Sequence, residues 1–397
     1  MGVLPLLLVS VLLIDAAMAW GDEGHMLIGA IARHILLKSH GGSSLVKALE
    51  KVLYVWEEQY PGLSRLTTAP VWADHIKCEQ GRPWCRGLLR YDAIEVFNEW
   101  HYSDKPYNPQ DLPIPHFRRG THDALWLLER ANHTMINFGK KQNEGTALSW
   151  NLFLRLLLHV YGDIHQPLHS CTMFAKPYPH GDAGGNEIPV ILNHTAGHEH
   201  VGELHLFWDL GGGALEGNWP TLGPSDMEDE AVRLLAMFPE LWKSKHADKV
   251  GFREVLDESY KICAKFVYSE FDFSTLEKRQ PYYPSDAYVA QAQHTSLERM
   301  VLGGARLAKI LIPLARNAPP PQQIIGTREG LGLFGWSLEI WQALCGVLLL
   351  LSLCSSCGFM WVGWRNAYLR KMVQEGDMPR MALVRHHMHD NGIIAGD

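Results

Sequence analysis

Apolar residues recur at helical spacing in four long segments of the chain. The segments are residues 123–138, 147–164, 227–238 and 296–312. Apolar positions at i, i+3, i+4 and i+7 are typical of helices that bury one face. Strand-like alternation is confined to a few residues near "NEIPVIL", and neither a repeat nor a break in composition divides residues 20–312. We therefore predict a single, mainly α-helical domain.

A mostly apolar segment also occupies the beginning of the chain. Residues 3–14 are followed by Ala17-Met18-Ala19, the small-x-small pattern after which signal peptidase cleaves. We predict that residues 1–19 are a signal peptide and that Trp20 is the first residue of the mature protein. The alternative is a buried N-terminal helix.

A second apolar segment lies near the end of the chain. Residues 340–364 carry no formal charge and have tryptophans at both ends, and about 20 apolar residues suffice to cross a bilayer. This pattern predicts a transmembrane helix within residues 338–364, after a proline-rich linker at 317–337. Arg365, Arg370 and Lys371 follow at once, so the positive-inside rule places residues 365–397 in the cytoplasm. We expect a single-pass protein at the cell surface or in a membrane of the secretory pathway, with residues 20–316 outside or in the lumen.

Composition and charge narrow the functions open to this domain. The chain has 397 residues, of which 47% are hydrophobic, enough for a sizeable core. Residues 20–337 contain 31 lysines and arginines against 37 aspartates and glutamates, a net charge of −6. This balance excludes a basic footprint for nucleic acid over the whole domain. A polyanion would need metal ions or a local basic patch.

The cysteines fit an oxidising compartment. Three of the seven lie in the predicted membrane span. The other four are predicted to form two disulfides: Cys78, Cys85, Cys171 and Cys263. Three pairings are open, and the short spacing favours Cys78 with Cys85, which leaves the other two for each other. The N-H-T triplets at Asn132 and Asn193 are predicted glycosylation sites.

Ligand-type side chains cluster in "HVYGDIHQPLH", residues 159–169. His159 and Asp163 are four residues apart and share one face of a helix, and His205 and Asp209 in "LHLFWDL" repeat this spacing. One such pair is more typical of a surface ion pair than of a metal site. Two pairs, together with His169 after a helix-breaking proline, favour metal binding. Imidazole and carboxylate ligands suit zinc.

Further candidate ligands stand in order along the chain. "WGDEGH" contains Trp20 and His25, "WADH" contains Asp74, and "HYSD" contains His101. With "GGN" at 184–186, the whole pattern resembles the zinc-dependent class I single-strand nucleases and 3'-nucleotidases, the mung-bean-type family. Because of the predicted anchor, it most resembles the membrane-bound trypanosomatid branch of that family. The resemblance implies a helical domain around a trinuclear zinc cleft, as in zinc phospholipases C.

The resemblance also implies a ligand set for three zinc ions. The sets are Asp74, His101, His159 and one oxygen of Asp163 for the first ion; the other oxygen of Asp163, His25, and the amine and carbonyl of Trp20 for the second; and His169, His205 and Asp209 for the third. In this arrangement Asp163 bridges two ions. The remaining histidine of the segment, His165, is expected to be a core residue or a neighbour of the site.

Substrate and catalytic roles are implied in the same way. Lys77 corresponds to a basic residue that reaches the phosphate, although a solvent-exposed lysine is the alternative. Asp104 corresponds to an aspartate beside the attacking water, Tyr102 to an aromatic that stacks on a base, with a core tyrosine as the alternative, and Asn186 to a substrate-binding residue. The implied substrates are single-stranded nucleic acid, cleaved to 5'-phosphorylated products, and 3'-nucleotides. No protein partner is predicted.

Two features depart from the family pattern or lie outside it. Glu203 stands where relatives usually carry asparagine, which leaves base preference open. The histidines of "HTAGHEH", residues 194–200, are expected in a solvated loop rather than at a metal.

Two other functions remain open at this stage. One is a phospholipase C-like phosphodiesterase, which an assay of phosphatidylcholine against adenosine 3'-monophosphate distinguishes. The other is a non-enzymatic metal-binding or adhesion protein, for which a missing ligand would be the expected sign.

Overall fold

The computed structural model describes residues 20–77, 94–115, 117–118, 120–138, 147–194 and 197–320, together with residue 371. Residues 20–320 fall within one compact unit, Met1–Ile325. The predicted signal peptide, the membrane segment, the cytoplasmic tail apart from residue 371, most of the linker, and Cys78 and Cys85 lie outside the described residues. No helix in the described ranges combines the length and the hydropathy that a membrane span requires.

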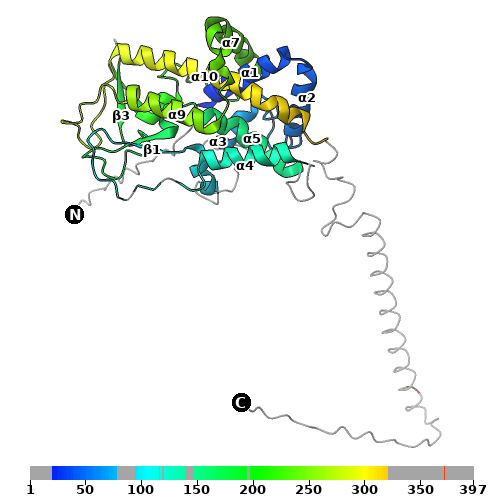
Figure 1. The fold of residues 1–397 in the computed structure, drawn as a ribbon, viewed down its shortest axis with the longest axis horizontal. Helices are drawn as coiled ribbons and strands as arrows, with labels where there is room; N and C mark the ends of the chain where they lie inside the picture. Colours follow the sequence, from blue (N-terminus) through cyan, green and yellow to red (C-terminus); the bar gives the residue numbers. More distant parts are fainter. Residues whose placement is uncertain are drawn as a thin grey trace, which may run out of the picture. The chain divides into compact units, whose positions relative to one another are not determined.

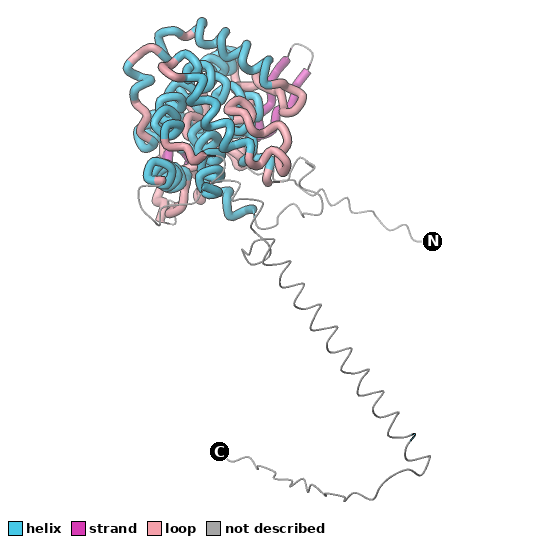
Figure 2. The backbone as a smooth tube through the Cα atoms, turned by 90° about the vertical axis from the view of Figure 1, so that its right-hand side faces the viewer, coloured by secondary structure: helices cyan, strands magenta, loops and turns pink. Residues whose placement is uncertain are grey.

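Helices make up most of the described domain (Figures 1 and 2). Their bounds are α1 (Asp22–Lys38), α2 (Gly42–Tyr54), η1 (Ala69–Val71), α3 (Trp72–His75), η3 (Ile94–His101), α4 (Ala124–Asn137), α5 (Ala147–Asp163), η4 (Pro167–Ser170), α6 (Leu204–Asp209), α7 (Pro224–Met237), α8 (Pro239–Trp242), η5 (Lys245–Asp248), α9 (Phe252–Ile262), the π-helical turn η6 (Cys263–Val267) and α10 (Asp286–Arg316). The prediction of a mainly α-helical domain is confirmed. The predicted helices correspond to α4, α5, α7 and α10, and α10 begins ten residues earlier than expected because the Ser285 hydroxyl caps it by accepting from the backbone N–H of Tyr288.

Helix α1 lies at the centre of the core and packs against α10, α7, α2 and α5. It is buried over most of its length, so its apolar pattern has no clear polar face. Glycine permits the closest approach to α10: a Cβ at Gly304 would lie 2.5 Å from the Ile31 side chain. Tight contact on both sides of α1 positions its first turn, which carries His25.

Within the described ranges, four short strands form two small sheets. Strand β1 (Lys105–Tyr107) pairs in parallel with β2 (Cys171–Met173), and β3 (Pro189–His194) pairs antiparallel with β4 (Gly197–Glu203). The prediction of a loop across residues 194–200 is therefore wrong for the described backbone, which continues the β3–β4 pairing. The physical reason is that the side chains of Val190 and Leu192, at alternate positions of β3, are buried. Such alternation is typical of a strand, whose backbone pairs with its neighbour. The histidine side chains of this hairpin lie outside the described residues.

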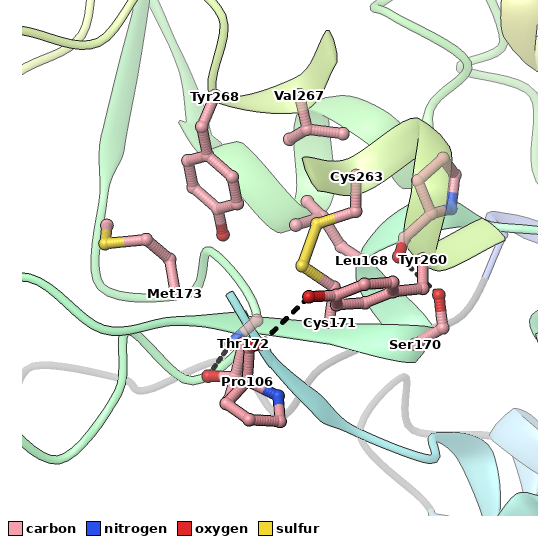
Figure 3. Close-up of a disulfide and its surroundings, with 12 residues drawn as sticks. Pro106, Leu168, Ser170, Cys171, Thr172, Met173, Tyr260, Cys263, Val267 and Tyr268 are labelled. Carbon is pink, nitrogen blue, oxygen red and sulfur yellow. Dashed lines mark hydrogen bonds between the residues drawn. A yellow bond between two sulfur atoms is a disulfide. The ribbon is translucent and has the colours of Figure 1, made fainter. Parts of the chain in front are cut away.

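A disulfide joins Cys171 to Cys263, as predicted (Figure 3). The two Cα atoms are 6.4 Å apart and the residues are 92 positions apart in sequence. The bond ties the start of β2 to the turn that follows α9. Because Cys171 follows His169 by two residues, the cross-link also anchors the segment that carries this histidine. Of the predicted glycosylation sites, Asn132 is a partly exposed residue of α4, and Asn193 belongs to β3, with its side chain outside the described part.

Candidate metal centre

Helix α5 carries the centre of the site and is held in place by polar groups that are unusual in so apolar a helix. Arg155 is fully buried and donates hydrogen bonds to the carbonyls of Leu63 and Leu53, at 2.6 and 2.7 Å. The first bond satisfies a buried backbone acceptor, and the second adds to the bonds that the Leu53 carbonyl accepts from the Trp56 backbone N–H and the Ser64 hydroxyl. The register of α5 is thereby set, and its last turn presents His159 and Asp163 to the same side.

The first group of ligand-type atoms joins α5 to two other segments. Asp74 comes from α3 and His101 from the end of η3, and both are buried with His159. The His159 Nε2 atom lies 3.0 Å from His101 Nδ1 and 3.6 Å from Asp74 Oδ2, and His101 Nδ1 lies 3.8 Å from Asp74 Oδ1. Three elements that are distant in sequence thus converge on one point.

Asp163 stands between this group and His25. Its Oδ2 atom is 3.1 Å from His101 Nδ1 and 3.4 Å from His159 Nε2, whereas its Oδ1 atom is 3.2 Å from His25 Nε2. The rings of His25 and His159 stack at 3.9 Å, and a Cβ at Gly162 would lie 3.2 Å from His25 Nδ1. Oδ2 therefore faces His101 and His159 while Oδ1 faces His25, as a bridging ligand requires.

Trp20 lies beside this junction. Its side chain is fully buried, and the indole N–H donates to the carbonyl of Gly162 at 3.0 Å. The next residue, Gly21, donates its backbone N–H to the carbonyl of Asp209, also at 3.0 Å. The predicted mature N-terminus is thus held between Asp163 and Asp209.

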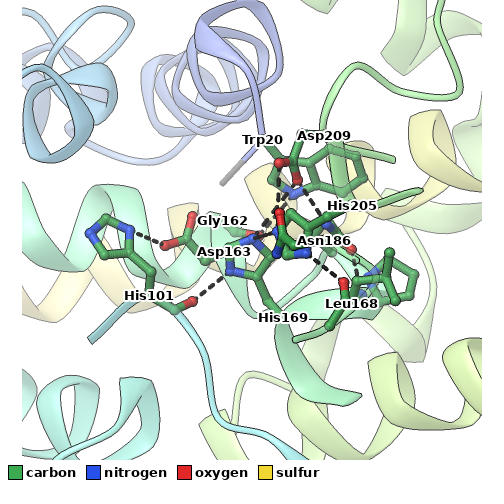
Figure 4. A network of polar contacts seen from close by, with 12 residues as sticks. Trp20, His101, Gly162, Asp163, Leu168, His169, Asn186, His205 and Asp209 are labelled. Atoms are coloured by element: carbon green, nitrogen blue, oxygen red, sulfur yellow. Dashed lines mark hydrogen bonds and ion pairs between the residues drawn. The ribbon is translucent and has the colours of Figure 1, made fainter. Parts of the chain in front are cut away.

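The third group consists of His169, His205 and Asp209, all buried (Figure 4). The Nε2 atoms of the two histidines are 3.1 Å apart. His205 Nε2 lies 3.6 Å from Asp209 Oδ2, and His169 Nε2 lies 3.8 Å from Asp209 Oδ1. His169 follows the end of α5, and the other two residues sit four apart on the short helix α6. The spacing within α6 follows from the sequence alone, whereas its approach to His169 was implied there only by the family resemblance.

Backbone carbonyls determine which nitrogen of each histidine is available. His159, His169 and His205 direct Nδ1 at the carbonyls of Pro70, His101 and Gly184, at 2.6, 2.6 and 2.7 Å. A carbonyl only accepts, so each Nδ1 carries the proton and each Nε2 presents a lone pair. Two such lone pairs face each other at 3.1 Å in His169 and His205. These lone pairs repel each other, and a cation bound between them would attract both.

Buried polar atoms without hydrogen-bond partners point to the same conclusion. Within the described ranges they include both ring nitrogens of His25, Oδ1 of Asp163 and Oδ2 of Asp209. Buried polar groups without partners are rare, because each loses its interactions with water. Here these atoms belong to the convergent groups. Nitrogen and carboxylate donors in sets of three or four fit zinc and similar transition metals.

Burial is the main cause of the pKa shifts of the candidate ligands: it disfavours the charged form of each carboxyl and each imidazole. Burial raises the pKa of Asp209 to about 8 and raises that of Asp163 well above its ordinary value, with the charge of Asp74 adding to the latter. Burial lowers the pKa of His159 to about 4 and also lowers those of His25 and His101. Neutral imidazole, the metal-binding form, is therefore present at neutral pH. Bound cations would return the carboxylates to their charged form.

Lys77 is buried and its ammonium donates to Asp74 Oδ1 at 2.8 Å. The alternative of a solvent-exposed lysine is wrong, because the end of α3 turns the residue into the site. Burial of Asp74 would raise its pKa, but the charges of Lys77 and three histidines bring it well below the usual range. Among the described lysines and arginines, Lys77 is the one that forms an ion pair with a candidate metal ligand.

The segment after His101 carries two of the predicted substrate residues. The Ser103 backbone N–H donates to the carbonyl of His169 at 2.8 Å, which places this segment between the first and third groups. Asp104 is partly buried, and burial, followed by the charges of Asp182 and Asp123, raises its pKa to about 7. Tyr102 is partly exposed, so it is not a core tyrosine.

Asn186 lies in the turn that supports His205. Gly184 in this turn provides the carbonyl bound by His205 Nδ1, and Ala183, Gly184 and Gly185 all have positive φ values, of 53°, 64° and 90°. The Asn186 amide donates to the Ala183 carbonyl at 2.7 Å and is partly exposed. Its contact to a substrate stays a prediction.

His165 does not join the three groups; it lies against Gly303 and contacts Arg306, as expected for a core residue. Two other buried residues were given no role from the sequence. His75 directs Nε2 at the buried carboxylate of Asp22, at 2.9 Å. The Gln166 amide donates to Asp209. No spacing rule predicts contacts of this kind, because their partners come from distant elements.

A mainly helical domain that buries three converging sets of histidine and aspartate fits a protein with a multi-metal site. The sequence profile of the S1/P1 nucleases matches residues 20–316, and the chain belongs to this family of hydrolases that act on phosphoester bonds. Endonuclease 3 of Arabidopsis thaliana is 26% identical over 315 residues, covering 77% of this chain and 92% of the relative. Endonuclease 5 of the same plant is 25% identical over 309 residues, 75% of this chain and 91% of the relative. Nuclease S1 of Aspergillus oryzae (strain ATCC 42149 / RIB 40) is 26% identical over 207 residues, 52% of this chain and 58% of the relative.

Proposed function

We propose that this chain is a zinc-dependent phosphoesterase that cleaves single-stranded RNA or DNA to 5'-phosphorylated products and removes phosphate from 3'-nucleotides. The observation that carries the proposal is the position of Asp163. One of its oxygens lies 3.2 Å from His25 Nε2, and the other lies 3.1 and 3.4 Å from His101 Nδ1 and His159 Nε2. Carboxylate-bridged pairs of metal ions are typical of phosphoester hydrolases. Family membership makes nucleic acid the substrate class.

The three sets would hold three zinc ions with the ligands that the sequence predicts. When bound at such a site, zinc lowers the pKa of water to about 7 and neutralises phosphate charge. The protein's own contribution is rigidity: each buried ligand histidine with a carbonyl partner is held in one tautomer and one orientation. Preorganised groups of this kind need no rearrangement as charge develops in the transition state.

Three side chains at the site would act on the substrate directly. Lys77 supplies the positive charge for a phosphate oxygen while its ammonium stays paired with Asp74. Asp104, with a pKa raised to about 7, suits the transfer of a proton to or from the attacking water at neutral pH. Tyr102, partly exposed, offers a face on which an unpaired base stacks. Stacking requires a base that is free of a duplex, which favours single strands.

The test is a substrate panel on the full-length protein with its zinc content measured in parallel. We expect three zinc ions per chain, release of phosphate from adenosine 3'-monophosphate, and faster cleavage of a single-stranded oligonucleotide than of the same sequence in a duplex. Hydrolysis of phosphatidylcholine in place of these substrates would support the phospholipase alternative. Full zinc content without turnover of any of the three would support a metal-binding or adhesion function.

We also propose that the catalytic domain faces the cell exterior or the secretory lumen. The supporting structural fact is the Cys171–Cys263 disulfide, a bond that persists in oxidising compartments. The uncharged segment at 340–364 supports a membrane anchor. Protease added to intact cells should remove a tag inserted in the exposed loop 277–281 but not one at the C-terminus. Protection of the loop tag at the surface and in sealed vesicles would contradict this topology.

A further inference from the structure

Gln166 is fully buried at the turn between α5 and η4, and both ends of its side-chain amide are used. The amide nitrogen Nε2 donates to Asp209 Oδ1 at 2.7 Å. The amide oxygen Oε1 accepts from the backbone N–H of Leu168 and caps η4. Its own backbone N–H donates to the carbonyl of Asp163 at 2.8 Å. The side chain thus connects η4 and α6, and the backbone N–H connects the residue to α5.

The first contact fixes the orientation of the Asp209 carboxylate. With Oδ1 occupied by the amide N–H, Oδ2 is left buried without a hydrogen-bond partner in the described ranges. This free oxygen faces His205 Nε2 at 3.6 Å. A carboxylate restrained in this way presents one chosen oxygen to a cation, whereas an unrestrained one rotates among several arrangements.

The second contact fixes the position of His169. Capping by Oε1 shapes the turn Pro167–Ser170, and the His169 backbone N–H donates to the Gln166 carbonyl at 3.2 Å. A carboxamide donates and accepts at the same time, which a carboxylate of the same length cannot do. Glutamine is therefore suited to hold both Asp209 and the turn with one side chain.

We infer that Gln166 is the positioning residue of the third metal site, where it selects the metal-binding oxygen of Asp209 and sets the turn that delivers His169. The inference rests on the proposed zinc-dependent function. This role differs from a general structural one because it concerns one ion of three. Among the described residues, the Gln166 side chain bonds Asp209 of the third group and the backbone of Leu168, and it bonds no ligand of the other two groups.

The variant that separates the two contacts is Gln166→Glu. Glutamate keeps the acceptor for Leu168 and so the turn, but it removes the donor to Asp209 and sets a second carboxyl against it. Changes in hydrogen-bond partners of metal ligands typically weaken metal binding by about 10- to 100-fold. We expect full-length Gln166→Glu to lose one zinc ion at a chelator concentration at which the wild type keeps three, and to retain the other two.

Gln293→Glu is the matched control. The Gln293 amide also donates a partly buried hydrogen bond, to the carbonyl of Gly212 at 3.2 Å, and lies outside the three groups. It should keep three ions and the wild-type chelator profile. If Gln166→Glu does not fold, as judged by circular dichroism, Gln166→Met replaces it, since Met has a similar length, no charge and no donor to Asp209. The same selective loss of one ion is expected.

The outcomes distinguish this inference from the proposed function. Three ions with an unchanged chelator profile in a folded Gln166 variant would overturn the inference alone. Parallel loss of all three ions would also overturn it, because the effect would then not be local to the third site. A wild-type chain that binds no zinc would overturn the proposed function and, with it, this inference.

Discussion

At the scale of single residues, the site is defined by the nitrogen and oxygen atoms that buried histidines and aspartates direct toward one another. His159, His169 and His205 each use one ring nitrogen on a backbone carbonyl and present the other to the site. Asp163 and Asp209 each keep one buried oxygen without a hydrogen bond among the described residues. The two aspartates differ in what they face: Asp163 directs one oxygen at His25 and the other at His101 and His159, whereas Asp209 faces only His169 and His205. Their substitution should therefore have unequal effects.

We expect Asp163→Asn to reduce activity more completely than Asp209→Asn. Loss of the Asp163 charge disturbs two ions, whereas loss of the Asp209 charge disturbs one. Zinc per chain should fall from three toward one in the first variant and toward two in the second. Asp257→Asn, which removes an exposed partner of Lys105, is the control. Equal zinc content and equal residual rates in the two site variants would contradict the bridging role.

Tyr102→Ala tests the contribution of stacking. The variant should weaken substrate binding by about 1 to 3 kcal/mol for all four bases, because every base presents a flat face. Hydrolysis of a small phosphodiester without a base should change little. Binding measured on four homopolymeric oligonucleotides provides the comparison. A loss confined to one base would indicate readout by hydrogen bonds instead of stacking.

At the scale of elements, one partly buried network of charged side chains connects α9 and α10 with the turn after α5. Glu258 of α9 binds Arg299 and Arg306 of α10, at 3.2 and 2.8 Å. Arg299 in turn donates to the carbonyl of His165, two residues after the end of α5. This network therefore ties α9, α10 and the turn after α5 together. It makes the packing of these helices depend on the charge of Glu258.

Glu258 gives a prediction for stability against pH. Its burial would raise the pKa of the carboxyl, but Arg306 and Arg299 outweigh burial and lower the pKa below its ordinary 4.5. A lowered folded-state pKa means that the stabilisation is complete above about pH 4.5 and is lost as pH falls through the folded value. Glu258→Gln should cost about 1.5 to 3 kcal/mol at pH 7.

The measurement is urea unfolding of both proteins between pH 7 and pH 3. The difference between wild type and Glu258→Gln should shrink as pH falls below 4.5. Glu254→Gln, which removes an exposed α9 carboxylate paired with Lys249 at 3.5 Å, should differ little from wild type throughout. A Glu258→Gln difference that stays constant over this pH range would show that charge is not its cause.

At the scale of the whole molecule, processing and catalysis are connected through the N-terminus. Trp20 is buried beside Gly162, and the next residue bonds Asp209. If Trp20 is the first mature residue, its α-amine is created only by cleavage. An amine with an ordinary pKa of roughly 7.7 to 8.0 must lose its proton to bind zinc. The precursor would then lack one ligand of the second ion.

Insertion of Gly-Ser between Ala19 and Trp20 should therefore lower both zinc content and activity while the domain stays folded. The extended mature chain should hold about two ions and show a reduced 3'-nucleotidase rate. N-terminal sequencing confirms where cleavage occurs, and the same dipeptide inserted after Asp397 is the control. Three ions and an undiminished rate in the extended protein would contradict both the amine ligand and the cleavage site.

The sequence by itself determined the helical class, the main helices and two of the candidate ligand pairs, because periodic burial and i, i+4 spacing are local properties; the full set of nine candidate ligands followed from the family resemblance. His159 with Asp163 and His205 with Asp209 needed only the geometry of one helix. The tertiary structure decided how these pairs combine: that Asp163 faces two histidine sets, that Lys77 is buried against Asp74, and that residues 197–203 pair as a strand. It also decided that Gln166 contacts Asp209 across 43 positions. Such contacts depend on how helices pack and which backbone carbonyls they leave nearby, and no local pattern encodes that.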